Sequence, residues 1–196
     1  MNKSYLIYVL IAIFIFVGYS ATNNNKDVKY TKLYSNELFF DNKEIIESTK
    51  SSTFGNEDLK GKISLVFFGY TTCPDFCPDT LSRMNTVLNK IENKNTIQLI
   101  FVSINPKDGL DQVKKYVEYF NERFIGLTLS ENHLNNLAKR TGVYIKKIEK
   151  ENNIDFYDHT GAIFLVGKEA KITGLYTPPL NNQDILNDLN VLVKYD

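Results

Sequence analysis

Both cysteines of this 196-residue chain fall within one octapeptide, TTCPDFCP at residues 71–78. The octapeptide directly follows an apolar run, residues 63–70, whose length and β-branched and aromatic content predict a buried strand. The prolines that follow this run suit a sharp turn into a helix that begins near Pro74. Cys73 and Cys77 would then lie one turn apart on one helix face, where the positive end of the helix dipole lowers a thiol pKa. Thiolates serve both redox exchange and the binding of soft metal ions.

The spacing of the two cysteines leaves both kinds of chemistry open. Three residues separate Cys73 from Cys77, whereas a thioredoxin-type dithiol oxidoreductase usually has two between its cysteines. Positions i and i+4 of a helix lie about 6 Å apart at Cα, within the range that a disulfide tolerates. The same spacing lets two thiolates approach one metal ion from the same side. A structural zinc site is disfavoured because it wants four protein ligands, and the two cysteines and two histidines are not in finger spacing.

His159 is the candidate for a third ligand. It stands in the segment YDHTG, residues 157–161, directly before a predicted strand at 162–166. Taken alone, a loop histidine beside Asp158 is more often a surface residue. Two thiolates and one imidazole, however, make a three-coordinate site suited to both oxidation states of copper, because sulfur favours Cu(I) and imidazole suits Cu(II). The other histidine, His133, falls in the first turn of a predicted helix and is expected at the surface.

Apolar periodicity predicts the elements that must position these residues. Continuous apolar runs predict strands, and apolar residues three to four apart predict helices. The expected strands are 63–70, 97–104, 127–129, 143–148, 162–166 and 171–176, with a short hairpin at 38–40 and 45–46. The expected helices are 75–92, 110–120, one capped by Ser130, and 181–194. This alternation favours an α/β fold with a mixed central sheet covered by helices on both faces, in the order of the thioredoxin arrangement.

The N-terminal residues predict export. We expect residues 1–22 to be a membrane anchor or signal peptide, 23–35 a polar tether and 36–196 the thioredoxin-like domain. Residues 5–21 are uncharged and would rise about 25 Å as a helix, near the lower limit for a hydrocarbon core of roughly 30 Å. Gly18 and Ser20 also suit cleavage after Ser20, so a retained anchor and a removed signal peptide both stay open. A buried core helix is a third interpretation, disfavoured because nothing in the segment alternates polar with apolar.

Composition narrows the surroundings and the partners. The chain has 23 basic and 23 acidic residues and no basic cluster of five or six, so we do not expect nucleic acid as a partner. An arginine-rich transit peptide is absent from the sequence, which favours a bacterial envelope over a mitochondrion. We expect a monomer at the bacterial inner membrane with its domain on the periplasmic side, or secreted to the periplasm if the leader is cleaved.

Several short motifs resemble the Sco/SenC family of copper proteins. They are GYTTCPDFCP at 69–78, FVSI at 101–104 with Pro106, LT at 127–128, GVY at 142–144 and DHT at 158–160. The resemblance covers roughly residues 58–176 and implies a thioredoxin-like domain, tethered outside a membrane, that binds one copper ion, Cu(I) or Cu(II), through Cys73, Cys77 and His159. It also implies delivery of copper to, or reduction of thiols in, the binuclear copper centre of cytochrome c oxidase. The implied partner is therefore the copper-receiving subunit of a terminal oxidase.

One stretch departs from the family's pattern. The family usually has Asp-Pro followed shortly by another acidic residue, whereas this chain has Asn105, Pro106, Lys107 and Asp108. Asp108 fills the second acidic position if one residue is deleted, or it is a turn residue before a glycine. Asn105 lacks the first charge and cannot anchor a cationic partner or metal as strongly, so we expect partner docking to differ.

The main rival function is an exported thiol–disulfide oxidoreductase or a peroxiredoxin-like peroxidase that uses Cys73 and Cys77 as a redox-active disulfide. Redox exchange gives His159 no necessary role. A peroxidase would also want a threonine or serine at the position of Tyr70, three residues before the first cysteine. A purely structural disulfide is a third interpretation, disfavoured because so short a loop gains little entropy.

Overall fold

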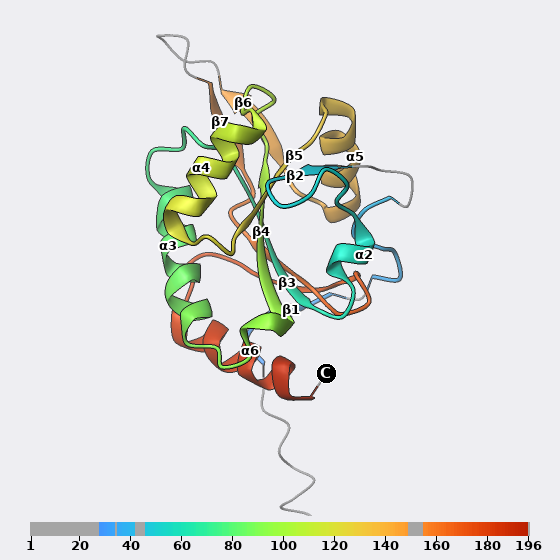
Figure 1. Ribbon diagram of the computed structural model, residues 1–196, viewed down its shortest axis with the longest axis vertical. Helices are drawn as coiled ribbons and strands as arrows, with labels where there is room; N and C mark the ends of the chain where they lie inside the picture. The colour runs from blue at the N-terminus through green and yellow to red at the C-terminus, as the bar shows by residue number, and fades with distance from the viewer. Residues whose placement is uncertain (1–27, 34, 42–45, 149–154, 196) are drawn as a thin grey trace, which may run out of the picture.

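The computed structural model describes residues 28–33, 35–41, 46–148 and 155–195 (Figure 1). Two parallel strands, β3 (Ile63–Gly69) and β4 (Ile97–Ser103), lie at the centre, and every residue of both is buried. Such continuous burial explains their unbroken apolar runs, which are typical of strands covered on both faces. The expected central strands are confirmed to within a residue at their ends.

The main sheet is mixed and has the strand order β1-β9-β8-β3-β4-β5-β2. β8 (Ile163–Val166) runs antiparallel to β3, and β5 (Ile125–Thr128) runs parallel to β4. β9 (Ile172–Tyr176) pairs antiparallel with β8 after a turn in which the Gly167 N–H donates to the Lys171 carbonyl, 2.9 Å away. The predicted mixed sheet is thereby confirmed.

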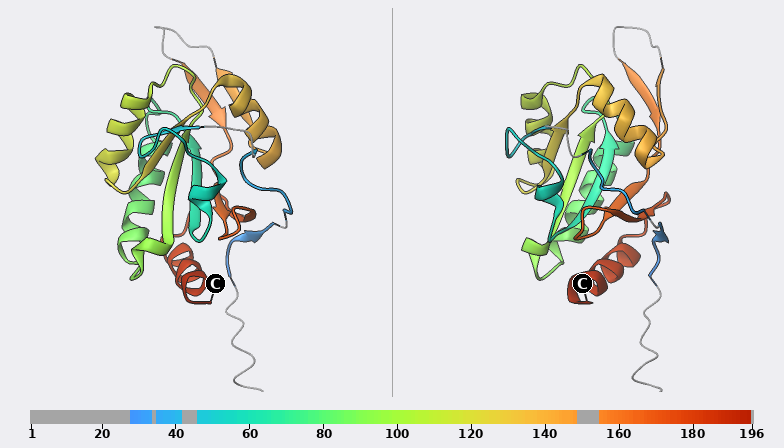
Figure 2. Two further views of the ribbon diagram at one scale, coloured as in Figure 1. Left: turned by 45° about the vertical axis from the view of Figure 1, so that its right-hand side comes forward. Right: turned by 90° about the vertical axis from the view of Figure 1, so that its right-hand side faces the viewer.

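Helices cover both faces of this sheet. α3 (Phe76–Asn89) and α4 (Leu110–Phe120) flank one side and α5 (Glu131–Thr141) flanks the other (Figures 1 and 2). α6 (Asn182–Tyr195) packs against α3. α2 (Asn56–Leu59) and the 3₁₀ helix η1 (Lys94–Thr96) are short connectors. Ser130 caps α5 as predicted, because its side chain accepts a hydrogen bond from the backbone N–H of His133.

The predicted hairpin at 38–40 and 45–46 is wrong. Leu38 makes an isolated bridge with Lys171 and Ile46 makes one with Phe54, while residue 45 lies outside the described residues. The short strands near the N-terminus, β1 (Thr31–Lys32) and β2 (Glu47–Ser48), instead occupy opposite edges of the main sheet.

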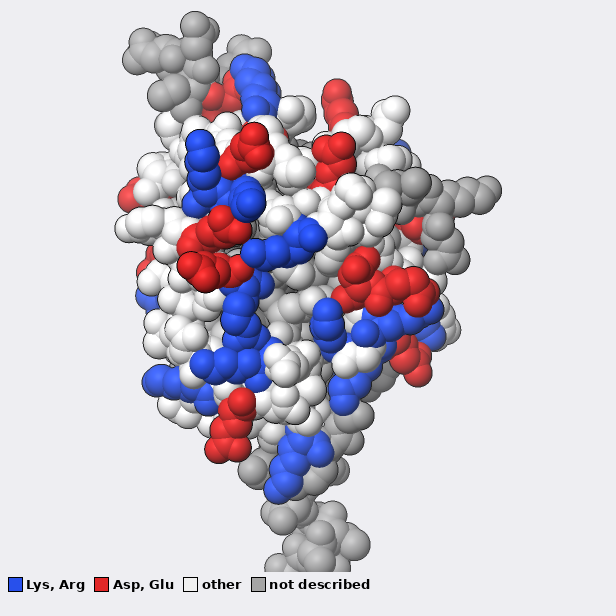
Figure 3. All heavy atoms as spheres, viewed as in Figure 1, with Lys and Arg blue, Asp and Glu red and all other residues white. Residues whose placement is uncertain are grey.

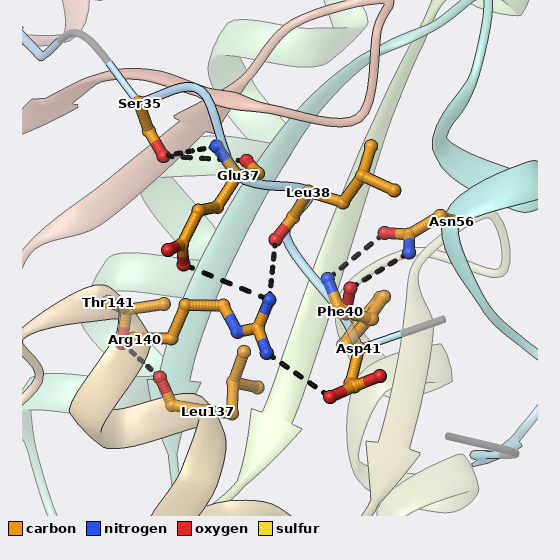
Figure 4. A network of polar contacts seen from close by, with 9 residues as sticks. All are labelled: Ser35, Glu37, Leu38, Phe40, Asp41, Asn56, Leu137, Arg140 and Thr141. Carbon is orange, nitrogen blue, oxygen red and sulfur yellow. Dashed lines mark hydrogen bonds and ion pairs between the residues drawn. The ribbon is translucent and has the colours of Figure 1, made fainter. Parts of the chain in front are cut away.

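Contacts with side chains, and not the strand pairing of a hairpin, fix residues 37–41 (Figure 4). The Asn56 amide accepts from the Phe40 N–H at 3.0 Å and donates to the Phe40 carbonyl at 2.9 Å, as a paired strand would. Arg140 of α5 donates to the Leu38 carbonyl at 3.3 Å and lies 3.6 Å from the Asp41 carboxylate. The apolar run that suggested a strand therefore reflects burial, since Phe39 and Phe40 are both fully buried.

A two-stranded ribbon stands apart from the main sheet. β6 (Ile145–Ile148) pairs antiparallel with β7 (Phe156–His159), and neither joins the larger sheet. The ribbon lies at the end of the molecule where β4 leads into α4, opposite the C-terminus (Figure 1). β7 was not predicted, so His159 ends a strand where the sequence suggested a loop.

The N-terminal predictions fall largely outside the described part of the chain. Residues 1–22, expected to be an anchor or signal peptide, and most of the tether at 23–35 are not described. Among the residues that are described, the structure holds no helix long and apolar enough to cross a membrane. On the face drawn in Figure 3, basic and acidic side chains are interspersed, in keeping with their equal numbers in the chain.

Candidate dithiol and histidine site

The two cysteines lie where β3 turns into α3, but they do not share a helical turn. α3 begins at Phe76, with Asp75 as its N-cap, so the expected start near Pro74 is two residues too early. Pro78 occupies the third position of the helix, where its missing N–H costs nothing because that donor has no partner within the helix. Cys73 precedes the helix, and the backbone N–H of Cys77 donates to its Sγ at 3.4 Å. Cys73 therefore lies outside α3 and accepts a hydrogen bond from a backbone N–H of the first turn of the helix.

The two thiols differ in exposure. Cys77 is fully buried under the end of β3, whereas Cys73 is half-buried, and both are free thiols. Gly69 makes room for the buried sulfur, because a Cβ at this position would lie 3.0 Å from the Cys77 Sγ. A molecule arriving from solvent thus meets Cys73 before Cys77.

The protonation of the pair is equally asymmetric. The pKa of Cys73 falls to about 6, chiefly because the Cys77 thiol donates a hydrogen bond to it, with help from the backbone N–H groups of Cys77 and Asp75. The pKa of Cys77 is raised by that same bond and by burial. One proton is therefore shared by two sulfurs: Cys73 is a thiolate near neutral pH while Cys77 stays a thiol.

The structure brings His159 to this pair. Its Nε2 lies 4.0 Å from the Cys77 Sγ, and its Nδ1 lies 3.1 Å from the Thr160 carbonyl oxygen. Because a carbonyl only accepts, Nδ1 carries the proton and the Nε2 lone pair faces the sulfur. Burial lowers the pKa of His159, which keeps the imidazole neutral and available as a ligand.

Aromatic rings enclose the imidazole. The rings of Phe67, Tyr70 and Phe76 have their centroids 6.2 to 6.4 Å from that of His159. The site opens through a hollow of about 350 Å³, and Phe76 on its rim is 39% exposed. The lining residues are Tyr70, Cys73, Pro74, Asp75, Phe76, Phe156, Tyr157, Asp158 and His159.

The donor set fits a soft metal ion. Two sulfurs and one imidazole nitrogen suit copper, and the 4.0 Å between the Cys77 Sγ and the His159 Nε2 is within the reach of two metal–ligand bonds of about 2.3 and 2.0 Å. Across the described residues, no three His, Cys, Asp or Glu side chains already stand as close together as ligands around an ion. Binding one ion through all three residues therefore requires them to draw together.

Two residues of the loop after β4, Asn105 and Asp108, are both buried. Asp108 is buried, and its carboxylate accepts hydrogen bonds from the Thr71 N–H and the Thr71 hydroxyl, both at 2.9 Å. It is therefore a structural anchor for the turn that carries Cys73, more than an ordinary turn residue. Asn105 is only 7% exposed, and the expectation that its missing charge alters partner docking stays a prediction.

The fold is thioredoxin-like: a mixed sheet is covered by helices, and two thiols lie at the turn from a central strand into a helix. An antiparallel ribbon places a histidine beside these thiols, which gives the domain a site with soft ligands. The SCO1/SenC family model matches residues 46–194. The chain belongs to this family.

Its relatives and structural neighbours agree with this assignment. The chain is 32% identical over 123 residues to the mitochondrial SCO1 homolog 1 of Arabidopsis thaliana, a match that covers 61% of this chain and 37% of that protein. Apo Sco1 from Thermus thermophilus superposes with a TM-score of 0.74 and 28% identity over 87% of this chain and 99% of that one. Copper-bound ScoI of Arabidopsis thaliana superposes with a TM-score of 0.71 and 27% sequence identity, and the match covers 77% of this chain and 96% of that one.

Proposed function

We propose that this protein is a membrane-tethered metallochaperone of the Sco/SenC type that binds one copper ion through Cys73, Cys77 and His159. The observation that carries the proposal is the place of the imidazole. Its Nε2 lone pair faces the buried thiol at 4.0 Å while Nδ1 is engaged by the Thr160 carbonyl. A dithiol reductase has no need of such a group, whereas a copper site that holds both oxidation states does.

Each of the three residues has a distinct task in this proposal. Cys73 and Cys77 supply the soft ligands that retain Cu(I), and His159 supplies the nitrogen that makes Cu(II) binding strong. Cys73 is the exposed thiolate, so a recipient's ligand would exchange there first. Family membership and the copper-bound ScoI of Arabidopsis thaliana support copper as the cargo.

Family membership supports the proposed partner, and the uncharged residues 5–21 support the proposed location. We propose that the recipient is the copper-receiving subunit of a terminal oxidase and that the protein assists assembly of its binuclear copper centre. We further propose that residues 5–21 hold the chain at the bacterial inner membrane, with residues 36–196 on the periplasmic side as a monomer.

Copper titration of ligand variants tests the proposal. The reduced protein is titrated with Cu(I) against a competing chelator and, separately, with Cu(II) while thiolate-to-copper absorption is recorded. We expect one copper per chain, loss of tight Cu(I) binding in Cys73→Ser and Cys77→Ser, and loss of most Cu(II) affinity but not of Cu(I) in His159→Ala. His133→Ala, at the other histidine, is the matched control. Equal Cu(II) affinity and spectra in wild type and His159→Ala would refute the three-ligand site.

A second candidate function is thiol–disulfide exchange, and the asymmetry of the thiols favours it. A half-exposed Cys73 of low pKa above a buried Cys77 of raised pKa is the arrangement of an attacking and a resolving thiol. The metal-free protein should then form an intramolecular disulfide under oxidant, detected by mass spectrometry. Fast reduction of a disulfide substrate that is unchanged in His159→Ala, together with weak copper binding, would favour this function over the first.

A further inference from the structure

We propose that Asn105 is a positioning residue that fastens the β6–β7 ribbon to the loop after β4 and thereby holds His159 beside Cys77. The inference rests on the proposed copper site for its consequence, but the contact itself is a property of the metal-free protein. We call the chain of contacts Thr71–Asp108–Asn105–Tyr157 the latch.

The ribbon needs such a fastening because the main sheet does not hold it. In the described part of the chain, β6 and β7 pair only with each other. The Tyr157 hydroxyl donates to the Asn105 Oδ1 at 3.1 Å, and the Tyr157 ring packs edge-on against Tyr70 with centroids 5.2 Å apart. Tyr157 and His159 are two residues apart in one strand, so their side chains share a face. Whatever fixes Tyr157 therefore orients His159.

Asn105 is itself firmly held on its other side. It is 7% exposed, and its Nδ2 donates to the Asp108 Oδ1 at 3.0 Å. Asp108, 5% exposed, also accepts from the Ser103 hydroxyl at 2.7 Å and from the Thr71 N–H at 2.9 Å. The latch thus runs from two residues before Cys73 to two residues before His159. It joins the segment that carries the thiols to the segment that carries the imidazole.

An amide suits position 105 because it donates and accepts at once. The Asn105 Oδ1 accepts from Tyr157 and from the Lys107 N–H, the latter at 3.1 Å, while Nδ2 donates to Asp108. An ionised aspartate there would still accept from Tyr157 but would have no proton for Asp108. It would also place two carboxylates in contact, which disfavours the ionisation of both. The departure from the family's usual acidic residue is therefore matched to the neighbours that this chain has.

Releasing the latch should affect the two oxidation states of copper unequally. The Cys73 thiol lies in the turn between β3 and α3 and the Cys77 thiol lies on α3, so both would stay in place, whereas the imidazole would move with the ribbon. Cu(I), which two thiolates retain, should be little affected, and Cu(II), which needs the imidazole, should bind severalfold more weakly. An ion pair between Lys107 and Asp155, at 2.8 Å, also joins this loop to the ribbon, and the Asp155 side chain is only 14% exposed. Substitutions at Asn105 and Tyr157 leave both of these side chains in place, so the ion pair is a second fastening and the latch variants should loosen the ribbon without freeing it.

The first test needs no metal. Amide hydrogen exchange of the reduced, metal-free protein is compared for wild type, Asn105→Leu, Tyr157→Phe and the double variant. Tyr157→Phe loses one hydrogen bond and should speed exchange of the β6 and β7 amides about fivefold, leaving the β3 amides unchanged. Asn105→Leu also loses the bonds to Asp108 and to the Lys107 N–H and should speed ribbon exchange at least as much. Tyr119→Phe removes a hydroxyl from a side chain that is 84% exposed on α4 and serves as the matched control. Because Asn105→Leu disturbs a buried network, Tyr157→Phe keeps the test valid if the first variant folds poorly.

The double variant isolates the bond. If Asn105 and Tyr157 act through one contact, the double variant should exchange no faster than the more affected single variant. Multiplying effects, or ribbon exchange at the wild-type rate in both single variants, would overturn the latch.

Copper binding separates failure of the latch from failure of the proposed function. We expect Tyr157→Phe to weaken Cu(II) binding severalfold, with reduced thiolate-to-copper absorption, and to leave Cu(I) affinity unchanged. If His159→Ala loses Cu(II) but Tyr157→Phe and Asn105→Leu do not, the latch is wrong and the copper site stands. If His159→Ala binds Cu(II) like wild type, the copper site is wrong, and hydrogen exchange still decides whether the latch holds the ribbon.

Discussion

Replacing Gly69 with alanine tests the close packing of the buried thiol against the end of β3. A Cβ at this position would lie 2.7 Å from the Phe101 Cε2, 3.0 Å from the Cys77 Sγ and 3.2 Å from the Phe67 Cε1. Carbon atoms in favourable contact are about 3.5–4.0 Å apart, so all three neighbours must move. Both phenylalanine rings are fully buried in the central strands and have no free space to enter.

The cost follows from this overlap. Inserting a methyl group into a packed core costs about 1–3 kcal/mol. In a domain of this size each kcal/mol lowers Tm by roughly 2–4 °C, so Gly69→Ala should unfold roughly 3–10 °C below wild type. Because the Cys77 Sγ is one of the atoms displaced, its spacing to the His159 Nε2 should change and Cu(II) affinity should fall as well.

Thermal unfolding followed by circular dichroism and Cu(II) titration of the reduced protein measure the two effects. Gly109→Ala is the control, because no atom lies within 4 Å of a Cβ at that position. Gly109 is the N-cap of α4, where alanine is less favourable, so a loss of at most about 1 kcal/mol is expected there. If Gly69→Ala keeps the wild-type Tm and copper affinity, the Cys77 thiol does not depend on this close approach.

Two further predictions concern the reactive thiol and the N-terminal edge. The rate of Cys73 alkylation should rise with pH through about 6 and then level off, since the thiolate is the reactive form. Cys77→Ala removes the thiol that donates a hydrogen bond to Cys73, so it should move this rise to higher pH. A pH profile that does not shift would contradict the donor role of Cys77. Asp188 is buried, and its Oδ2 accepts from the Lys29 N–H at 2.8 Å and the Tyr30 N–H at 3.1 Å. Asp188→Ala should therefore lower the free energy of unfolding by about 2 kcal/mol, or Tm by roughly 4–8 °C. Asp188→Asn keeps an acceptor oxygen and should lower Tm less. Equal Tm values for both variants would show that these hydrogen bonds do not stabilise the edge of the sheet.

Strong periodicity made parts of the fold predictable from the sequence. The helix at Leu110–Phe120 begins and ends at the predicted residues, and β3 and β4 each end one residue earlier than predicted. Weak or ambiguous local signals account for the differences. A proline after Cys73 is compatible with either a helix start or the turn before one, and only the cap geometry places the start at Phe76. β7 was missed because its four residues carry little apolar alternation and its partner, β6, is mostly exposed.

The residue types of the candidate site were recognisable in the sequence, but their arrangement depends on contacts that no local pattern contains. The His159 imidazole meets a sulfur 82 residues earlier, Tyr157 meets Asn105 across 52 residues, and Thr71 meets Asp108 across 37. The loss of charge at Asn105 predicted a change in partner docking without reference to burial, because a sequence shows the charge of a residue and not its burial. Once buried, an amide is selected by the donors and acceptors around it. At position 105 those neighbours lead to both halves of the proposed copper site, so a substitution there should act on the oxidation state that the site prefers before it acts on any partner.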